Sequence, residues 1–174
     1  MLRVATRAAH DRVDALFSTL DLASAADYRR FLSAQAAAFL PIERALDEAG
    51  AADLFADWPR RHRGELLRAD LDALGIAVPP EVAPVAFGSP GAVAGGVYVL
   101  EGSRLGGAFL ARAVAPGFPS AFLASPQPPG QWRIFLGQLE QALASSVHHR
   151  QAIDGAVRSF DYFARAGSLA LEGR

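Results

Sequence analysis

The sequence contains no cysteine. The chain can therefore form no disulfide, zinc–thiolate site or iron–sulfur cluster, and it has no cysteine nucleophile. Lysine is also absent, so arginine supplies all 17 basic side chains. An anionic ligand would have to be held by arginine, by histidine or by neutral hydrogen-bond donors. The net charge of −1 gives no overall attraction to nucleic acid or to an acidic membrane.

Targeting and membrane segments are not indicated either. The first residues carry a charge every few positions and lack the apolar centre of a signal peptide. The one uncharged stretch of membrane-like length, residues 82–100, contains two prolines and four glycines and leads directly into Glu101. We interpret it as a loop that enters a helix, and we expect a cytoplasmic protein.

Apolar residues recur in steps of three and four along most of the chain, which is the spacing of a helix face. Hydrophobic residues make up 51 % of the composition, enough for a chain of this length to bury a core. Alternating strand-like runs are missing. We predict an all-α fold of about six helices, forming a single domain over residues 1–174. The first expected helix is 4–20, and the second is capped by Ser24 with Asp27 and kinked at Pro41. The third runs from Asp57 to just before Gly75 and is followed by a Pro-rich connector at 76–90. A glycine-rich fourth helix runs from Ser89 to Pro116, and two more lie around 132–143 and 153–163.

The first predicted helix carries a second face beside its apolar one. Its members follow in steps of four and three: Arg3, Arg7, His10, Asp14 and Phe17. The Asp14 carboxylate could accept the Nδ1 hydrogen of His10 and leave Nε2 free to bind a metal. One histidine will not hold a bare ion, but it can be the axial ligand of an iron held by a porphyrin, whose propionates suit arginine. The alternative is a structural or solvated histidine beside solvated arginines, Arg7 above all.

Glycine is unusually frequent in GGVYVLEGSRLGGAFL, residues 95–110, where it occurs five times. Each glycine inside a helix costs roughly 1 kcal/mol relative to alanine. Gly102 and Gly106 are one turn apart and leave one face bare, which Gly95 would extend. Two explanations remain open. The helix backbone could approach a flat macrocycle, or it could pack tightly against another helix.

Together these regions resemble the bacterial haem oxygenases, especially the branch associated with bacteriophytochromes. YVLEGSRLGGAFL is similar to that family's distal-helix signature, and TRAAHDRVD to its proximal-ligand segment. DWPRRHRGELLRADLDALG and QWRIFLGQL are also similar, so the resemblance covers nearly the whole chain. It implies an α-helical haem oxygenase fold, with haem between the first helix and the glycine-rich helix.

The resemblance also implies the reaction and its partners. Haem is both cofactor and substrate, and it is cleaved to biliverdin, carbon monoxide and ferrous iron with O2 and external electrons. The electron donor would be a ferredoxin or a flavin reductase, and a bacteriophytochrome would accept the biliverdin. No nucleic acid and no membrane is expected as a partner.

Individual residues take expected roles from the resemblance. His10 matches the axial iron ligand, while Gly102 and Gly106 match the glycines on the oxygen side. Ser103 stands where some members have an aspartate that organises water, so proton delivery stays unassigned. The full set of expected site residues is His10 as metal ligand, Gly102, Ser103 and Gly106 as catalytic residues, and Arg3, Arg7, Asp14, Tyr98 and Phe160 as haem-binding residues.

Three other functions remain open. A haem carrier or sensor would use the same residues without degrading its ligand. A di-iron enzyme needs Glu-x-x-His pairs, and no glutamate here has a histidine three residues on. A plain helical interaction protein would use the glycines for packing alone.

The other titratable residues are expected to have structural or solvated roles. We expect His62 within RRHR, His148 and His149 to be solvated, Glu43 to be a buried structural carboxylate, and Glu101 to pair with Arg104.

Overall fold

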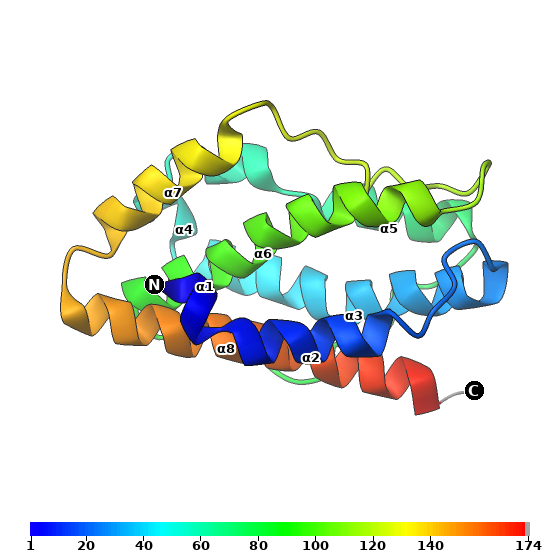
Figure 1. The fold of residues 1–174 in the computed structure, drawn as a ribbon, viewed down its shortest axis with the longest axis horizontal. Helices are drawn as coiled ribbons and strands as arrows, with labels where there is room; N and C mark the ends of the chain where they lie inside the picture. Colours follow the sequence, from blue (N-terminus) through cyan, green and yellow to red (C-terminus); the bar gives the residue numbers. More distant parts are fainter. Residues whose placement is uncertain (173–174) are drawn as a thin grey trace.

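The computed structural model describes residues 1–172, and within that range it contains helices, turns and loops but no strand. The expected all-α fold is therefore confirmed (Figure 1). The elements are α1 (Leu2–Ala5), α2 (Arg7–Phe17), α3 (Ala25–Glu48), α4 (Ala51–Leu54), η1 (Trp58–Arg61), α5 (Gly64–Ala73), α6 (Pro90–Leu110), η2 (Ala111–Ala113), α7 (Gln131–Ala142) and α8 (Ser146–Glu172), where η marks a 3-10 turn.

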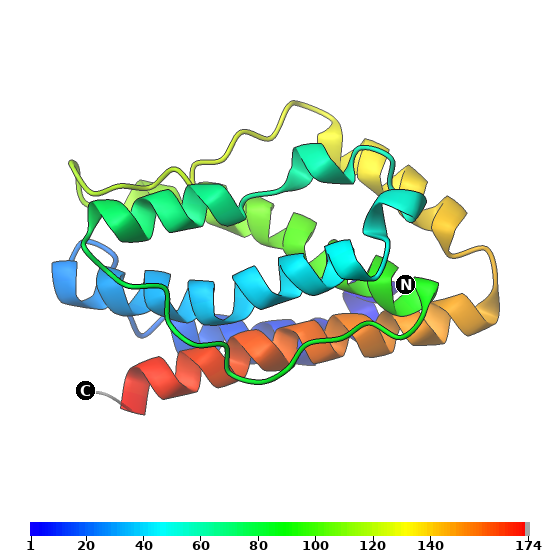
Figure 2. The same ribbon diagram turned by 180° about the vertical axis from the view of Figure 1, so that it is seen from behind.

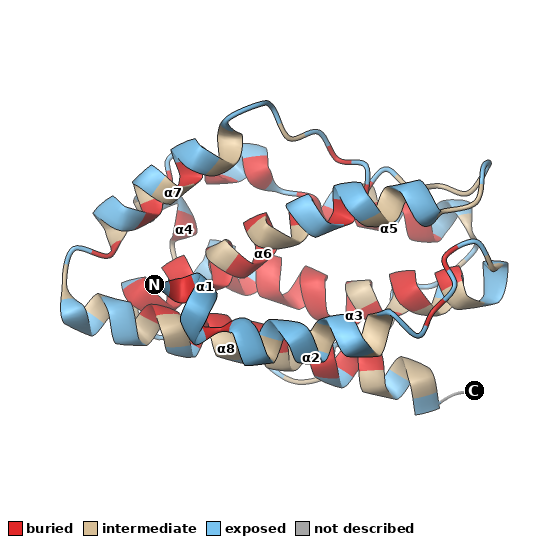
Figure 3. Cartoon of the chain, in the orientation of Figure 1, coloured by how far each residue is buried: buried red, intermediate tan, exposed pale blue. Residues whose placement is uncertain are grey.

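Helix α3 forms the centre of the core. Every residue from Ala36 to Glu43 is buried, and this run is longer than two turns, so the helix is covered on all sides there. Pro41 lies inside α3 without ending it. Figure 3 shows the buried stretch of α3 behind α2 and α8. Helices α4, α5, α6 and α8 pack directly against α3, whereas α2 packs chiefly on α8 and α7 on α6.

Helices α6 and α8 touch backbone to backbone. A Cβ at Gly95 would lie 2.1 Å from the carbonyl oxygen of Ala152, and a Cβ at Gly155 would lie 2.3 Å from that of Ala92. No side chain fits at either position, so both glycines serve helix packing. This corrects the expectation that Gly95 extends the bare face of the later glycines.

The connector between α5 and α6, residues 76–89, crosses the molecule over α3 and α8 (Figure 2). It is fastened to α8 by the Tyr162 hydroxyl, which donates to the carbonyl oxygen of Pro84. Ser89 then begins α6, because its Oγ accepts a hydrogen bond from the Ala92 amide at 3.3 Å. The predicted connector and cap are confirmed.

Within residues 1–172, no helix has both the length and the apolar character needed to cross a bilayer.

The first helix differs from the prediction of one continuous helix over 4–20. It is divided at Thr6, whose backbone leaves the helical region at φ −101° and ψ 3°, and it ends at Phe17. The Thr6 hydroxyl donates to the Leu2 carbonyl oxygen at 3.0 Å, a side-chain bond that commonly bends a helix. The division gives α1 a direction of its own (Figure 1).

The segment from 57 to 75 is also divided, into η1 and α5. The amides of Arg63 and Gly64 donate to the carboxylate of Glu43, at 2.8 and 2.9 Å, and so begin a new helix. Neither Ser24 nor Asp57 makes the side-chain cap bond that the sequence suggested. The short helix α4 was not foreseen.

Candidate active site

A cavity of about 870 Å³ lies between α2 and α6, with walls that are mostly apolar. Helices α1, α3, α7 and α8, the residue Thr6 and the loop before α7 contribute the remaining lining residues. Its volume lies in the range typical of sites for organic ligands. The structure brings all nine residues expected at the site to this cavity, namely Arg3, Arg7, His10, Asp14, Tyr98, Gly102, Ser103, Gly106 and Phe160.

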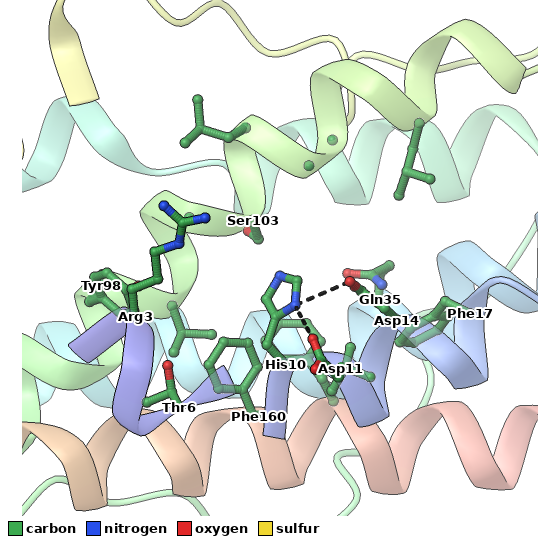
Figure 4. Close-up of a pocket in the computed structure, with 18 of the residues that line it drawn as sticks. Arg3, Thr6, His10, Asp11, Asp14, Phe17, Gln35, Tyr98, Ser103 and Phe160 are labelled. Atoms are coloured by element: carbon green, nitrogen blue, oxygen red, sulfur yellow. Dashed lines mark ion pairs between the residues drawn. The ribbon is translucent and has the colours of Figure 1, made fainter. Parts of the chain in front are cut away.

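His10 projects from α2 into the cavity toward α6 (Figure 4). Its Nδ1 lies 3.1 Å from Oδ2 of Asp14 and 3.8 Å from Oδ1 of Asp11. The ring of Phe160 meets the imidazole edge-on, with the centroids 5.7 Å apart. Both carboxylates lie on the Nδ1 side of the ring, so Nε2 is the nitrogen left for a ligand in the cavity.

The helix that carries His10 is attached by one side only. None of the residues of α2 is fully buried, and its principal neighbour is α8. An ion pair between Arg12 and Asp161 joins the two helices. Phe17 packs edge-on against Phe31 of α3, with the centroids 5.5 Å apart. Helix α2 therefore forms a rim of the cavity rather than a part of the core (Figure 3).

On the opposite wall, Gly102 and Gly106 of α6 face open space. A Cβ at Gly106 would meet no atom within 4 Å, and one at Gly102 would meet only Cη2 of Trp132, at 4.0 Å. In contrast, a Cβ at Gly107 would lie 3.1 Å from the carbonyl oxygen of Leu123. Of the two open explanations, packing holds for Gly95 and Gly107. The other two glycines leave the cavity wall bare.

Ser103 also faces the cavity, but its hydroxyl is already engaged. Its Oγ donates to the carbonyl oxygen of Leu100 at 2.7 Å and accepts a bond from Nη2 of Arg63 at 2.6 Å. The single hydroxyl hydrogen is therefore directed into the helix. Ser103 can offer a cavity ligand at most a lone pair.

One end of the cavity is polar. Arg3 of α1 lies beside Tyr98 of α6 (Figure 4). Burial raises the pKa of the Tyr98 hydroxyl, while the charge of Arg3 and a hydrogen bond with the Thr6 side chain oppose the rise. Arg7 is at the rim, 81 % exposed, with its Nε 3.7 Å from Asp11. This end is suited to the negative groups of a ligand whose body is apolar.

The basic run RRHR agrees with the expectation at His62, which is exposed, but not at its two arginine neighbours. Arg61 and Arg63 are only 3 % and 2 % exposed, so they do not belong to a solvated face. His62 lies 2.9 Å from Asp47. Arg61 and Arg63 are turned inward because the Glu101 carboxylate meets the first and the Leu100 carbonyl oxygen meets the second.

The roles expected for Glu43 and Glu101 are confirmed, whereas those expected for His148 and His149 are confirmed in part. Glu43 is a buried structural carboxylate, as expected. Glu101 pairs with Arg104 at 3.3 Å, as expected, and also with Arg61 at 2.7 Å. His149 is exposed, but His148 is partly buried and its Nδ1 has no hydrogen-bond partner.

Some cavity residues were not foreseen from the sequence. Gln35 and Trp132 both line the cavity, as does Thr6. Gln35 had a signal that could have been used, since it is a lone amide in the apolar run AQAAAF. Thr6 and Trp132 had no such signal, because their position depends on how α1 and α7 are placed.

In the described part of the chain, no group of three or more histidine or acidic side chains could hold a bare metal ion.

Comparison with known proteins identifies related sequences. A family model described as heme oxygenase matches residues 1–167. A heme oxygenase of Xanthomonas campestris pv. campestris is 40 % identical over 123 residues, which are 67 % of this chain and 73 % of that protein. Heme oxygenase PigA of Pseudomonas aeruginosa is 30 % identical over 172 residues, which are 93 % of this chain and 87 % of that protein.

A solved structure has the same fold. The NO- and CO-bound heme oxygenase of Neisseria meningitidis superimposes with a TM-score of 0.85 at 23 % sequence identity. The match covers 98 % of this chain and 90 % of that one. The helical arrangement around the cavity is thus shared with a protein of similar length.

Proposed function

This chain belongs to the haem oxygenase family, and on that premise we propose that it binds haem in the cavity between α2 and α6 and cleaves it there. The reaction is the family's oxidative conversion of haem to biliverdin, carbon monoxide and ferrous iron. The observation that carries the proposal is the pairing of two opposed walls. One presents His10 with Nδ1 directed to Asp14, and the other presents two glycines with no neighbour in front of them.

The residues present fit a haem. Its flat, apolar ring system matches a cavity whose walls are mostly apolar, and its propionates match the polar end with Arg3 and Tyr98. A Cβ at Gly106 would enter empty space, so the bare wall of α6 serves no neighbouring side chain. A site for a small polar metabolite would need convergent polar groups along both walls, whereas the α6 wall carries little beyond the engaged hydroxyl of Ser103.

On the α2 side, His10 would hold the haem iron through Nε2. The Asp14 carboxylate lies on the Nδ1 side of the ring, where it would fix the tautomer and the orientation of the imidazole. Phe160 of α8 supports the imidazole by an edge-on contact. Arg3 and Tyr98 would hold propionates and so determine how the macrocycle is rotated in its plane, with Arg7 at the rim as a further, exposed partner.

On the α6 side, the protein provides space and order. Haem, when bound, supplies the iron at which O2 is activated and is itself the molecule cleaved. Gly102 and Gly106 leave space for a small ligand, while the backbone behind them excludes a larger one. Ser103 directs its hydrogen to the Leu100 carbonyl oxygen, so it would organise water as an acceptor. Water, rather than a protein carboxylate, would then deliver protons in this cavity.

The further partners and the location are part of the proposal. The reaction needs electrons from outside, for which a ferredoxin or a flavin reductase is a suitable donor. A bacteriophytochrome is the proposed acceptor of biliverdin, on the resemblance to the branch associated with such proteins. We propose a cytoplasmic location and one functional domain over residues 1–174, as expected from the sequence.

A hemin titration of the purified protein, followed by a reductant, tests the proposal. The Soret absorption band should saturate at one haem per chain and then disappear when ascorbate or reduced ferredoxin is added in air. A haem carrier or sensor, which would use the same residues, would keep its Soret band after reduction. Retention of the band by the wild-type complex would therefore reject the enzymatic function and favour that alternative.

A further inference from the structure

Arg63 is a buried cation without an ion pair. Its side chain is 2 % exposed, and among residues 1–172 no carboxylate oxygen lies within salt-bridge distance of it. Glu43 bonds to the main-chain amides of Arg63 and Gly64 instead. Burial, and then repulsion from Arg104, lowers the pKa of Arg63 to about 9 against the opposing charges of Glu101 and Glu43, so the guanidinium stays charged at neutral pH. Such a charge reduces the stability of the fold.

The guanidinium lies directly behind the α6 wall of the cavity. It lies against the rings of Phe39 and Phe122, at 4.8 and 5.0 Å from their centroids, and the two rings also meet each other edge-on. Its Nη2 donates to the carbonyl oxygen of Leu100 at 2.5 Å and to Oγ of Ser103 at 2.6 Å, while Nε has no partner. Phe122 and Ser103 line the cavity. One layer of side chains therefore separates the charge from the site.

The two neighbouring buried arginines are neutralised. Arg61 pairs with Asp57 and Glu101, each at 2.7 Å, and Arg104 shares Glu101 at 3.3 Å. Both arginines line a second, smaller cavity rather than the site. Among the described residues, Arg61 and Arg104 thus have a carboxylate within salt-bridge distance, whereas Arg63, beside the site, has none and is balanced only from farther away by Glu43 and Glu101.

We propose that Arg63 is a positioning residue for the oxygen side of the haem site, where it fixes Ser103 and favours negative charge on the ligand of the iron. The inference rests on the proposed haem site. In an apolar interior, a fixed charge acts over a longer distance than in water, and it needs no reorganisation when negative charge develops nearby. It would provide the electrostatic contribution that Ser103, with its hydrogen directed to Leu100, does not provide.

The test compares an anionic and a neutral ligand of the ferric haem complex. Azide and imidazole are titrated into the wild type, Arg63→Met, Arg63→Lys and Arg61→Met. Arg63→Met should weaken azide binding by about fivefold or more and change imidazole binding by less than about twofold. Arg63→Lys should restore azide binding to within about twofold of the wild type, because the charge returns. Arg61→Met, which removes a neutralised arginine, should lower the melting temperature but keep the azide-to-imidazole ratio.

Two results would overturn the inference. Unchanged azide affinity in Arg63→Met would show that the charge does not reach the site. An equal loss of azide and imidazole binding would show that Arg63 only shapes the pocket. Arg63→Gln, which can still donate to Leu100, gives the same comparison if the methionine variant does not fold. A wild-type chain that bound no hemin would instead refute the proposed function, so the two failures are distinguishable.

Discussion

The imidazole Nδ1 of His10 lies 3.1 Å from the carboxylate of Asp14, one turn further along α2. The pair stands on the rim of the cavity, where both side chains remain more than half exposed. Gly102 and Gly106 lie on the opposite wall, where no side chain intervenes. A nitrogen donor on one wall and a bare backbone on the other define how a flat ligand would be oriented between α2 and α6.

Replacement of His10 by alanine should abolish turnover while some haem binding remains. The cavity walls and the polar end are unchanged in this variant, but the axial nitrogen is lost. The absorption spectrum of the ferric complex should change, and added imidazole should partly restore it. His149→Ala, at an exposed position of α8, is the control. If His10→Ala kept the wild-type spectrum and turnover, another residue would have to be the ligand.

Asp14→Asn tests the role of the carboxylate. The amide oxygen could still accept a hydrogen bond from Nδ1, but the negative charge beside the imidazole is removed. Groups that orient a metal-bound histidine typically contribute tenfold or more to metal affinity or activity. We expect turnover to fall about tenfold, measured with saturating reductant. Asp11→Asn, whose carboxylate lies at 3.8 Å, should change it much less, and equal effects of the two variants would contradict a specific role for Asp14.

The double variant Arg3→Ala, Tyr98→Phe should loosen the orientation of haem. A partly exposed charge contact contributes about 0.5–1 kcal/mol, so the dissociation constant should rise about two- to fivefold. The more specific effect is on the product, where chromatography should resolve a mixture of biliverdin isomers. Arg158→Ala, at an exposed position of α8, should leave the isomer pattern unchanged. A single isomer from the double variant would count against propionate binding at this end.

The glycines of α6 should divide into two classes. Gly102→Ala adds a methyl group to open space and gains helix propensity, so the apo protein should be stabilised by up to about 1 kcal/mol, or about 2–4 °C in melting temperature. Gly95→Ala places a Cβ 2.1 Å from the Ala152 carbonyl oxygen and should lower the melting temperature. In the haem complex, Gly102→Ala and Gly106→Leu should bind haem but stall in biliverdin formation, because the added carbons occupy the space of the small ligand.

Melting temperature and product yield must be measured on the same samples of these variants. A normal biliverdin yield from both Gly102→Ala and Gly106→Leu would place the oxygen pocket elsewhere. A destabilised Gly102→Ala apo protein would show that this glycine packs against something in solution, contrary to the open space in front of it.

The sequence was sufficient where the structural cause is local. Helical periodicity predicted the all-α fold, and the Ser89 cap predicted the start of α6. The spacing of Arg3, His10 and Asp14 placed them on one face, which the structure directs into the cavity. The spacing accounts for His10 and Asp14, which share one face of α2, whereas Arg3 reaches the cavity from the separate helix α1.

The sequence was insufficient where the cause lies in a distant element. Gly95 and Gly102 look alike in the chain, but only Gly95 meets the backbone of α8. The run RRHR reads as solvated, yet Glu101, forty residues further on, draws Arg61 inward. The burial of Arg63 depends on two phenylalanines from separate parts of the chain. Such contacts follow from tertiary packing, on which periodicity carries no information.

The most direct test of the central claim is the quantification of products from the wild-type haem complex in one turnover. The purified complex is given O2 and reduced ferredoxin, and biliverdin and carbon monoxide are measured against the haem consumed. If the cavity between His10 and the open glycines is a haem-cleaving site, both products should appear in amounts equal to the haem lost. Haem that stays bound and intact, or that bleaches without releasing carbon monoxide, would contradict the account.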